Sequence, residues 1–433
     1  MICAAGLAAL AVLFTVWAVK STYSFPGYAA AFVSVTLFAI LCLRFVPQWT
    51  GFWSRGAEDA ALPCGKDIPA HEIFLLFLLC DAAVIIAVFI IRTVSGCSTD
   101  IRDFLEFWRC TDSRHYLDIA REWYLSEGSI DRLVQLVFLP GYPIAVRLLN
   151  YLIGNDIVSG LVVSALSFSV SGCVLYKLLR LDLNSDDAMR CIKFLLISPA
   201  AFFFAAPMSE SLFFLLSVSC IYLARKRRLL LSCVIGALAS FTRSLGLMLM
   251  VPVLMELVHD CVNGREKAAK ALTVLLIPTG FAAYCYVNYL VAGDPFMFME
   301  YQSSHWHQHL GFFFNTAAYQ TEYALRYAKE GSVSLWGLSL PNITAAFASL
   351  ILVGLAAKKL RPTYMAYFIA YFVIAVGATW LLSAPRYLLV MPAVPLVMTY
   401  LSRDKRIDAL LTALSAVGYA EYITAFALRW QVW

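Results

Sequence analysis

The chain has 433 residues, of which 61% are hydrophobic and only 14% are charged, and its mean hydropathy is +0.75. Soluble domains carry about 25% charged residues, so this composition excludes a water-soluble globular protein. The formal net charge of +5 comes from short basic connections between apolar segments and gives no reason to expect a nucleic-acid partner.

Apolar segments long enough to cross a bilayer recur along the whole sequence. A spanning helix needs about 20 largely apolar residues, and on that criterion we expect an all-α polytopic membrane protein with about 11–13 transmembrane helices. The clearest segments are residues 2–19, 28–46, 73–94, 157–179, 229–258, 268–291, 335–357, 364–382, 387–401 and 407–428.

Two further apolar stretches, residues 136–153 and 191–223, are interrupted by prolines. Backbone of this kind is tolerated at membrane depth only where protein or water covers it. We expect one of the two not to cross the membrane.

Charge sets the predicted orientation. The basic clusters at residues 225–228, 358–361 and 403–406 are placed in the cytoplasm by the positive-inside rule, whereas the acidic segment 95–135 is placed outside. We expect a single membrane domain over residues 1–433. It comprises two N-terminal helices with a cytoplasmic loop (1–72), an external catalytic loop (95–135) and a second external loop (293–333).

The external loop contains an amphipathic segment from Asp112 to Tyr124, with apolar or aromatic residues at 116, 117, 119, 120, 123 and 124. This spacing predicts a helix lying in the membrane interface. Asp112 stands where that helix begins and has two possible roles. It is either an N-cap for the free backbone amides or a carboxylate base at the surface where a lipid-borne substrate arrives.

Several motifs follow in a characteristic order and spacing. They are Val137–Pro143 with Arg147–Leu149, Ser198–Phe204, Ser209–Phe213, Phe241–Gly246, Gly293–Phe296, the group Tyr301, Gln302 and Trp306, and Pro385–Leu389. From Asp112 to Tyr387 this ordered set resembles the PIG-V family, the membrane mannosyltransferases that add the second mannose of GPI anchors, together with their bacterial relatives.

The resemblance implies a GT-C type fold and a polyprenyl- or dolichyl-phosphate sugar as donor. It also implies that an acidic residue in the first large external loop acts as base, and Asp112 occupies that position. The sequence departs from the family at Thr111, where the family often has tryptophan; Trp108 is the nearest tryptophan upstream.

We therefore expect a glycosyltransferase that moves a sugar, most simply mannose, to an acceptor hydroxyl on the external or luminal face with inversion. Such chemistry needs a base and a cation for the leaving phosphate. Arg243 and Arg386 are the candidates for binding the donor phosphate, since an arginine inside an apolar protein needs an anionic partner. An ion pair with Glu210 is the alternative role for one of them.

The other candidate site residues are polar or aromatic side chains suited to a sugar. The full set of candidates for substrate binding is His115, Tyr116, Tyr142, Glu210, Gln302, His305, Trp306 and Tyr387. We expect no cofactor and no metal: His305, His307 and His309 alternate in one loop, without the well-spaced fourth ligand of a zinc site.

The expected partners are the polyprenyl- or dolichyl-phosphate sugar, a glycan or glycolipid acceptor and membrane lipids. The expected location is a bacterial cell membrane, with the endoplasmic reticulum membrane as the alternative. Two other functions share much of the pattern. A polysaccharide polymerase uses a pyrophosphate-linked oligosaccharide, and a lipid-linked oligosaccharide transporter needs no base on an external helix.

Overall fold

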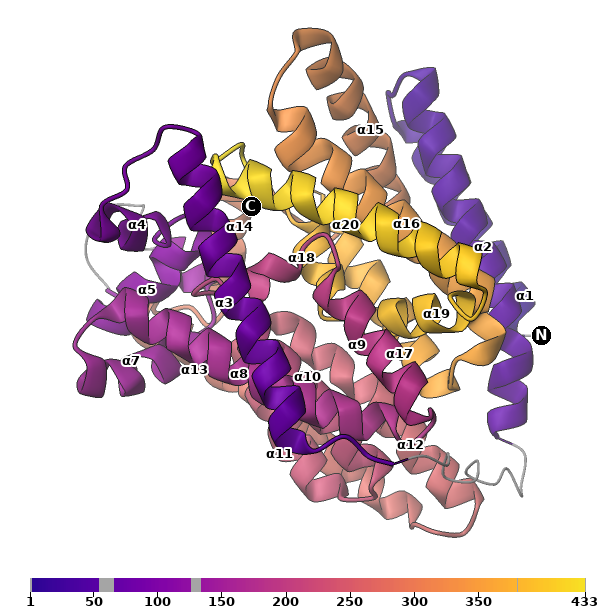
Figure 1. Ribbon diagram of the computed structural model, residues 1–433. Coiled ribbons are helices and arrows are strands. Elements are labelled where there is room, and N and C mark those ends of the chain that lie inside the picture. The colour runs from indigo at the N-terminus through magenta and orange to yellow at the C-terminus, as the bar shows by residue number, and fades with distance from the viewer. Residues whose placement is uncertain (1, 54–65, 126–133, 380, 433) are drawn as a thin grey trace. The chain divides into compact units, whose positions relative to one another are not determined.

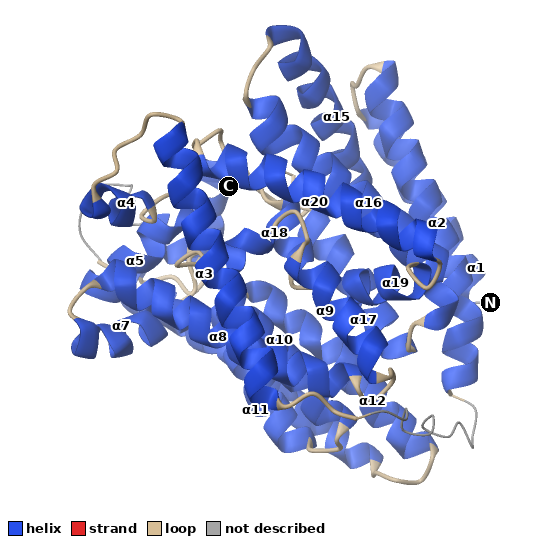
Figure 2. Ribbon diagram, in the orientation of Figure 1, coloured by secondary structure: helices blue, strands red, loops and turns tan. Residues whose placement is uncertain are grey.

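The computed structural model describes residues 2–53, 66–125, 134–379 and 381–432. Within these ranges the chain is built from helices and contains no strand, apart from one isolated bridge between Leu310 and Ala378 (Figures 1 and 2). Residues 54–65 of the predicted cytoplasmic loop and residues 126–133 of the predicted external loop lie outside the described ranges.

Within the described ranges, seven helical segments are long and apolar enough to cross a membrane. They are Phe25–Phe52, Ala70–Val94, Asp156–Leu179, Ser244–Val262, Ala268–Ala292, Leu335–Lys359 and Lys405–Ala427. Three shorter apolar helices accompany them, Ala5–Lys20, Leu229–Thr242 and Pro362–Val376. The chain is an all-α, multi-pass membrane protein, as its composition predicted, and the total of about 11–13 spans remains a prediction.

Two predicted continuous segments are interrupted in the structure, and a third is shorter than predicted. Residues 229–258 form α11 (Leu229–Thr242), a 3-10 segment (Ser244–Leu249) and α12 (Met250–Val262). Residues 387–401 divide between α18 (Ala384–Leu389) and α19 (Ala393–Leu401), with Pro392 at the junction. Proline lacks the amide hydrogen that would continue a helix. Residues 364–382 correspond to α17 (Pro362–Val376), which ends six residues earlier than predicted.

The two proline-interrupted stretches are likewise not single helices. Residues 134–153 form a short 3-10 turn (Val134–Val137) followed by α7 (Gly141–Ile153). Residues 185–225 form α9 (Ser185–Leu196), a 3-10 turn (Ala201–Phe204) and α10 (Glu210–Arg225). The expectation that one of them does not span is untested.

The chain divides into two compact units. The first comprises Met1–Ala57 and Gln308–Trp433. Its helices are α1 (Ile2–Lys20), α2 (Phe25–Phe52), α15 (Phe313–Glu330), a π-helical turn (Leu335–Ser339), α16 (Leu340–Ala356), a 3-10 turn (Ala357–Lys359), α17, α18, α19 and α20 (Lys405–Ala427). In this unit α2 packs against α15 and α16, so the beginning and the end of the chain fold together (Figure 1).

The second unit, Glu58–His307, contains the predicted external loop and most of the motifs. Its long helices form a series in which α3 (Ala70–Val94) packs on α8 (Asp156–Leu179), α8 on α10, α10 on α11, and α11 on α13 (Ile277–Ala292). A 3-10 segment (Ala268–Leu276) leads into α13. The short helices α4 (Ile101–Phe107) and α5 (Asp112–Glu122) precede α7, and α5 contacts both α7 and α8. Helix α14 (Met297–Trp306) ends the unit.

Candidate active site

Asp112 is the first residue of α5, and its side chain is half-buried. The cap position is occupied by Thr111, whose side chain makes no capping hydrogen bond and whose backbone has a positive φ of 49°. The N-cap position therefore falls on Thr111, one residue before Asp112. A β-branched residue with positive φ is uncommon and costs roughly 1–3 kcal/mol. Surrounding contacts must hold this start of α5 in place.

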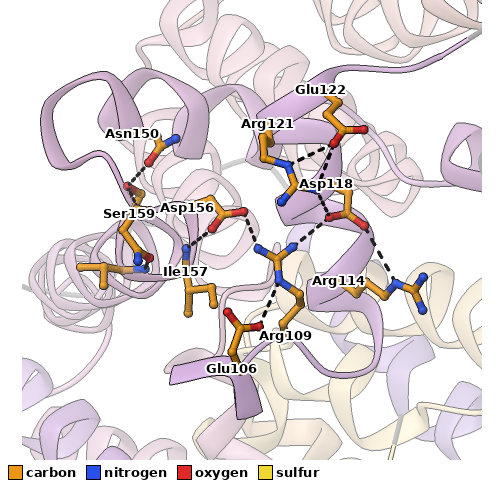
Figure 3. A network of polar contacts seen from close by, with 12 residues as sticks. Glu106, Arg109, Arg114, Asp118, Arg121, Glu122, Asn150, Asp156, Ile157 and Ser159 are labelled. Carbon is orange, nitrogen blue, oxygen red and sulfur yellow. Dashed lines mark hydrogen bonds and ion pairs between the residues drawn. The ribbon is translucent and has the colours of Figure 1, made fainter. Parts of the chain in front are cut away.

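One of those contacts is an ion cluster on the outer face of α5 (Figure 3). Arg109 lies between two carboxylates: its Nη1 is 2.8 Å from Asp118 Oδ1, and its Nη2 is 2.6 Å from Asp156 Oδ2. Asp118 belongs to α5 and Asp156 begins α8. Arg109 therefore ties α5 to α8.

A chain of polar contacts lies on the inner face of α5. The hydroxyl groups of Tyr116 and Ser209 are 2.9 Å apart. Arg243 Nη1 donates to Ser209 Oγ at 3.1 Å and to Glu210 Oε1 at 2.6 Å. The Glu210 side chain is 0% exposed and that of Arg243 is 11% exposed. The ion pair expected as an alternative for Arg243 is thus formed.

The sequence Phe241–Gly246 explains why Arg243 lies there. Helix α11 ends at Thr242, and Arg243 is extended, with φ −147° and ψ 138°. The Gly246 amide then donates to the Arg243 carbonyl at 2.8 Å, and the chain folds back onto the last turn of α11. A Cβ at Gly246 would lie 2.4 Å from the Ser240 nitrogen. Only glycine permits this close return of the backbone.

The motif Pro140–Pro143 fits against the same helix end. A Cβ at Gly141 would lie 2.4 Å from Thr242 Oγ1, so the start of α7 packs directly on the end of α11. Tyr142, which follows, is completely buried; its hydroxyl donates to the Gly160 carbonyl and lies 2.9 Å from Ser164 Oγ. The motif thus brings α7, α8 and α11 together beside Arg243.

Electrostatics connect Asp112 to this buried chain of contacts. Burial raises the pKa of Tyr116; the Arg243 charge opposes that shift, and the charges of Glu210 and Asp112 reinforce it. Tyr116 therefore remains a neutral hydroxyl. The three charged residues predicted from different motifs, Asp112, Glu210 and Arg243, all lie close enough to act on this one side chain.

Aromatic rings extend the same region towards α14. The His115 ring stacks on Phe138 with centroids 4.6 Å apart, and Phe138 meets Trp306 edge-on at 6.1 Å. Tyr116 contacts Phe138 and Tyr142 at 5.2 Å and 5.5 Å. The structure thus brings together most of the predicted aromatic candidates of the second unit.

The remaining candidates are divided between α14 of the second unit and α18 of the first. Gln302 is half-buried and His305 exposed on α14. Arg386 and Tyr387 belong to α18 of the first unit, where Arg386 is 2% exposed and interacts electrostatically with Tyr422. Among the described residues, no group of three His, Cys, Asp or Glu side chains could hold a metal ion.

Comparison with known proteins tests the family resemblance. The family model described as mannosyltransferase (PIG-V) matches residues 99–308. The resemblance predicted from the motif order is therefore confirmed, and the match supports a glycosyltransferase function. It covers the candidate residues of α5, α7, α10, α11 and α14.

A solved structure, that of ArnT from Cupriavidus metallidurans bound to undecaprenyl phosphate, is similar with 16% identity and a TM-score of 0.49. The similarity covers 84% of this chain and 76% of that chain. No curated protein matches the sequence.

Sequence reasoning missed the residues that hold the candidates in place. Ser209 joins Tyr116 to Arg243 but was recognised only as part of a motif. Arg109 and Asp156 are absent from the predicted site. The sequence offers a signal for Asp156, because it is a charged residue at the start of a long apolar helix. Phe138 lies between His115 and Trp306; its membership of the motif Val137–Pro143 was the only signal for it in the sequence.

We predict that Arg109→Met destabilises the protein by about 1.5–3 kcal/mol, because it leaves two partly buried carboxylates without their shared donor. The matched control is Arg114→Met. Arg114 is 70% exposed and 4.0 Å from Asp118, whereas the Arg109 side chain is 19% exposed. Thermal unfolding and amide hydrogen exchange in α5 measure the effect. Equal stability of the two variants would contradict the conclusion that Arg109 stabilises the packing of α5 on α8.

We predict that Glu210 and Arg243 stabilise the fold as a pair. Each of Glu210→Ala and Arg243→Met should cost about 3–5 kcal/mol, and the double variant should cost less than the sum by about 0.5–3 kcal/mol. The exposed pair Arg326 and Glu330, 3.8 Å apart, is the control, with an expected coupling of about 0.3–0.5 kcal/mol. Additive losses for the buried pair would refute this prediction.

Proposed function

We propose that the chain is a glycosyltransferase that moves mannose from a polyprenyl-phosphate donor to an acceptor hydroxyl at the external or luminal membrane face, with inversion. One observation carries this proposal. Asp112 begins an amphipathic helix inside the region that matches the mannosyltransferase family, and it acts on the same tyrosine as the buried Arg243–Glu210 pair.

The proposed reaction is a single displacement. The acceptor oxygen forms a bond to the anomeric carbon while its proton passes to the Asp112 carboxylate. The bond between that carbon and the phosphate oxygen breaks, and the electron pair leaves with the lipid phosphate. The carboxylate acts as general base, and a cation must stabilise the departing anion.

Arg243 and Arg386 are the proposed ligands of the donor phosphate. Arg243 already shares its guanidinium between Ser209 and Glu210, so a phosphate would have to join an existing ion pair. A guanidinium has five N–H donors in a planar fork, which permits it to contact two acceptors at once. Arg386 offers a second buried guanidinium on α18.

For the sugar we propose two groups of residues. His115, Gln302, His305, Trp306 and Tyr387 retain some exposed surface and supply hydrogen bonds and aromatic faces. Tyr116 and Tyr142 are buried and hydrogen-bonded within the protein, so they position the others rather than enclose the sugar. The reaction as proposed needs no metal or cofactor, and the proposed location is a bacterial cell membrane.

The test of this proposal replaces the carboxylate of Asp112, the proposed base. Asp112→Asn in the purified protein, assayed with polyprenyl-phosphate mannose, should lower the transfer rate by about 10²–10⁴-fold, because general-base catalysis contributes on that scale. Asp103→Asn is the matched control: the same substitution at an exposed residue of α4 in the same loop should leave the rate unchanged. Full activity of Asp112→Asn would remove the base role.

The choice of donor separates the proposed activity from its two rivals. A polymerase would consume a polyprenyl-pyrophosphate oligosaccharide instead of the monophosphate sugar, and a transporter would release no polyprenyl phosphate from either donor. We expect release of polyprenyl phosphate from the monophosphate sugar alone, in proportion to acceptor added. Activity with the pyrophosphate donor alone would replace the proposed function by that of a polymerase.

A further inference from the structure

A hollow of about 650 Å³ lies at the start of α11, in the second unit. Three basic residues line it, Arg227, Arg228 and Lys270, together with the apolar side chains of Leu230, Leu231 and Val234. No carboxylate is among the lining residues. The hollow is at the opposite end of α11 from Arg243 and is separate from the candidate active site.

Two of the three basic residues around the hollow form ion pairs with carboxylates. Arg227 Nε lies 3.3 Å from Asp260 Oδ1, and Lys270 Nζ lies 2.6 Å from Glu266 Oε2. Arg228 is exposed, and its side chain forms no ion pair or hydrogen bond with any residue that the structure describes. An arginine at this position therefore has its donors available for an anion.

The apolar part of the hollow is unusual for a surface bathed in water. Leu230, Leu231 and Val234 are 63%, 45% and 43% exposed, and they follow Arg228 directly along α11. This helix has 14 residues, so its axis is about 21 Å long at about 1.5 Å per residue. The hydrocarbon core of a bilayer is about 30 Å thick. With Arg228 at the level of the headgroups, as the positive-inside rule predicts for this basic cluster, Leu230, Leu231 and Val234 would lie among acyl chains.

We propose that this hollow binds an acidic glycerophospholipid, with the phosphate on Arg228 and the acyl chains along Leu230, Leu231 and Val234. The positive-inside rule places the 225–228 cluster at the cytoplasmic leaflet, where the acidic lipids carry the negative surface potential. Charge complementarity and the adjoining apolar surface together select a lipid over a soluble phosphate.

The test measures lipid binding to the purified full-length protein in detergent by native mass spectrometry. Phosphatidylglycerol should bind more tightly than phosphatidylcholine. Arg228→Gln should weaken phosphatidylglycerol binding about fivefold, the contribution of one basic residue near a membrane surface. Lys358→Gln, which removes an exposed lysine from another basic connection, should leave binding unchanged. Thermal unfolding of each variant confirms that the fold is kept.

A second variant probes the apolar contact. Leu231→Asn should weaken phosphatidylglycerol binding without changing the charge of the hollow. Three results would overturn the proposal: equal binding by wild type and Arg228→Gln, displacement of phosphatidylglycerol by inorganic phosphate, and preferential binding of polyprenyl monophosphate. The last two would assign the hollow to a soluble anion or to the reaction's own lipid.

Discussion

The buried ion pair between Arg243 and Glu210 constrains the arrangement of the second unit. Two charges removed from water cost several kcal/mol each unless they are paired and their other hydrogen-bonding groups are satisfied. The structure pairs the two charges by ending α11 before Arg243, starting α10 at Glu210 and placing Ser209 between Arg243 and Tyr116. The break between α11 and the 3-10 segment that follows it is thus explained by the need to pair the Arg243 charge.

Helix α5 is fixed from two sides, and Asp112 depends on both. Its inner face is held by Tyr116, one helical turn after Asp112 and therefore on the same side of the helix. Its outer face is held by Asp118, which Arg109 connects to α8. The base role proposed for Asp112 would need such support, because a group misplaced by about 1 Å can lose about 100-fold in rate. The strained Thr111 at the helix start is tolerated for the same reason: the contacts that follow it determine where α5 begins.

The sequence predicted the class of the protein better than its details. Composition and apolar length suffice for an all-α membrane protein, and amphipathic spacing suffices for α5. The break at Arg243 was not predicted, because Leu229–Val258 is predominantly apolar and the signal lies in a single arginine followed by Gly246. The meeting of Asp112, Glu210 and Arg243 could not be derived from spacing, since these residues come from α5, α10 and the end of α11. The order of the motifs indicated that these residues belong together, but their relative positions could be known only from the folded structure.

Helix α11 shows how the same residue type acquires different roles at its two ends. Arg243 follows its last residue within the protein, where an unpaired guanidinium would be costly, and its charge is matched by Glu210. Arg228 precedes its first residue at the surface, where water or a lipid headgroup can match the charge at little cost. An apolar helix of 14 residues is too short to place both ends in water. The arginine inside the protein is therefore satisfied by Glu210, and the exposed arginine at the other end remains available to water or to the lipid that we propose.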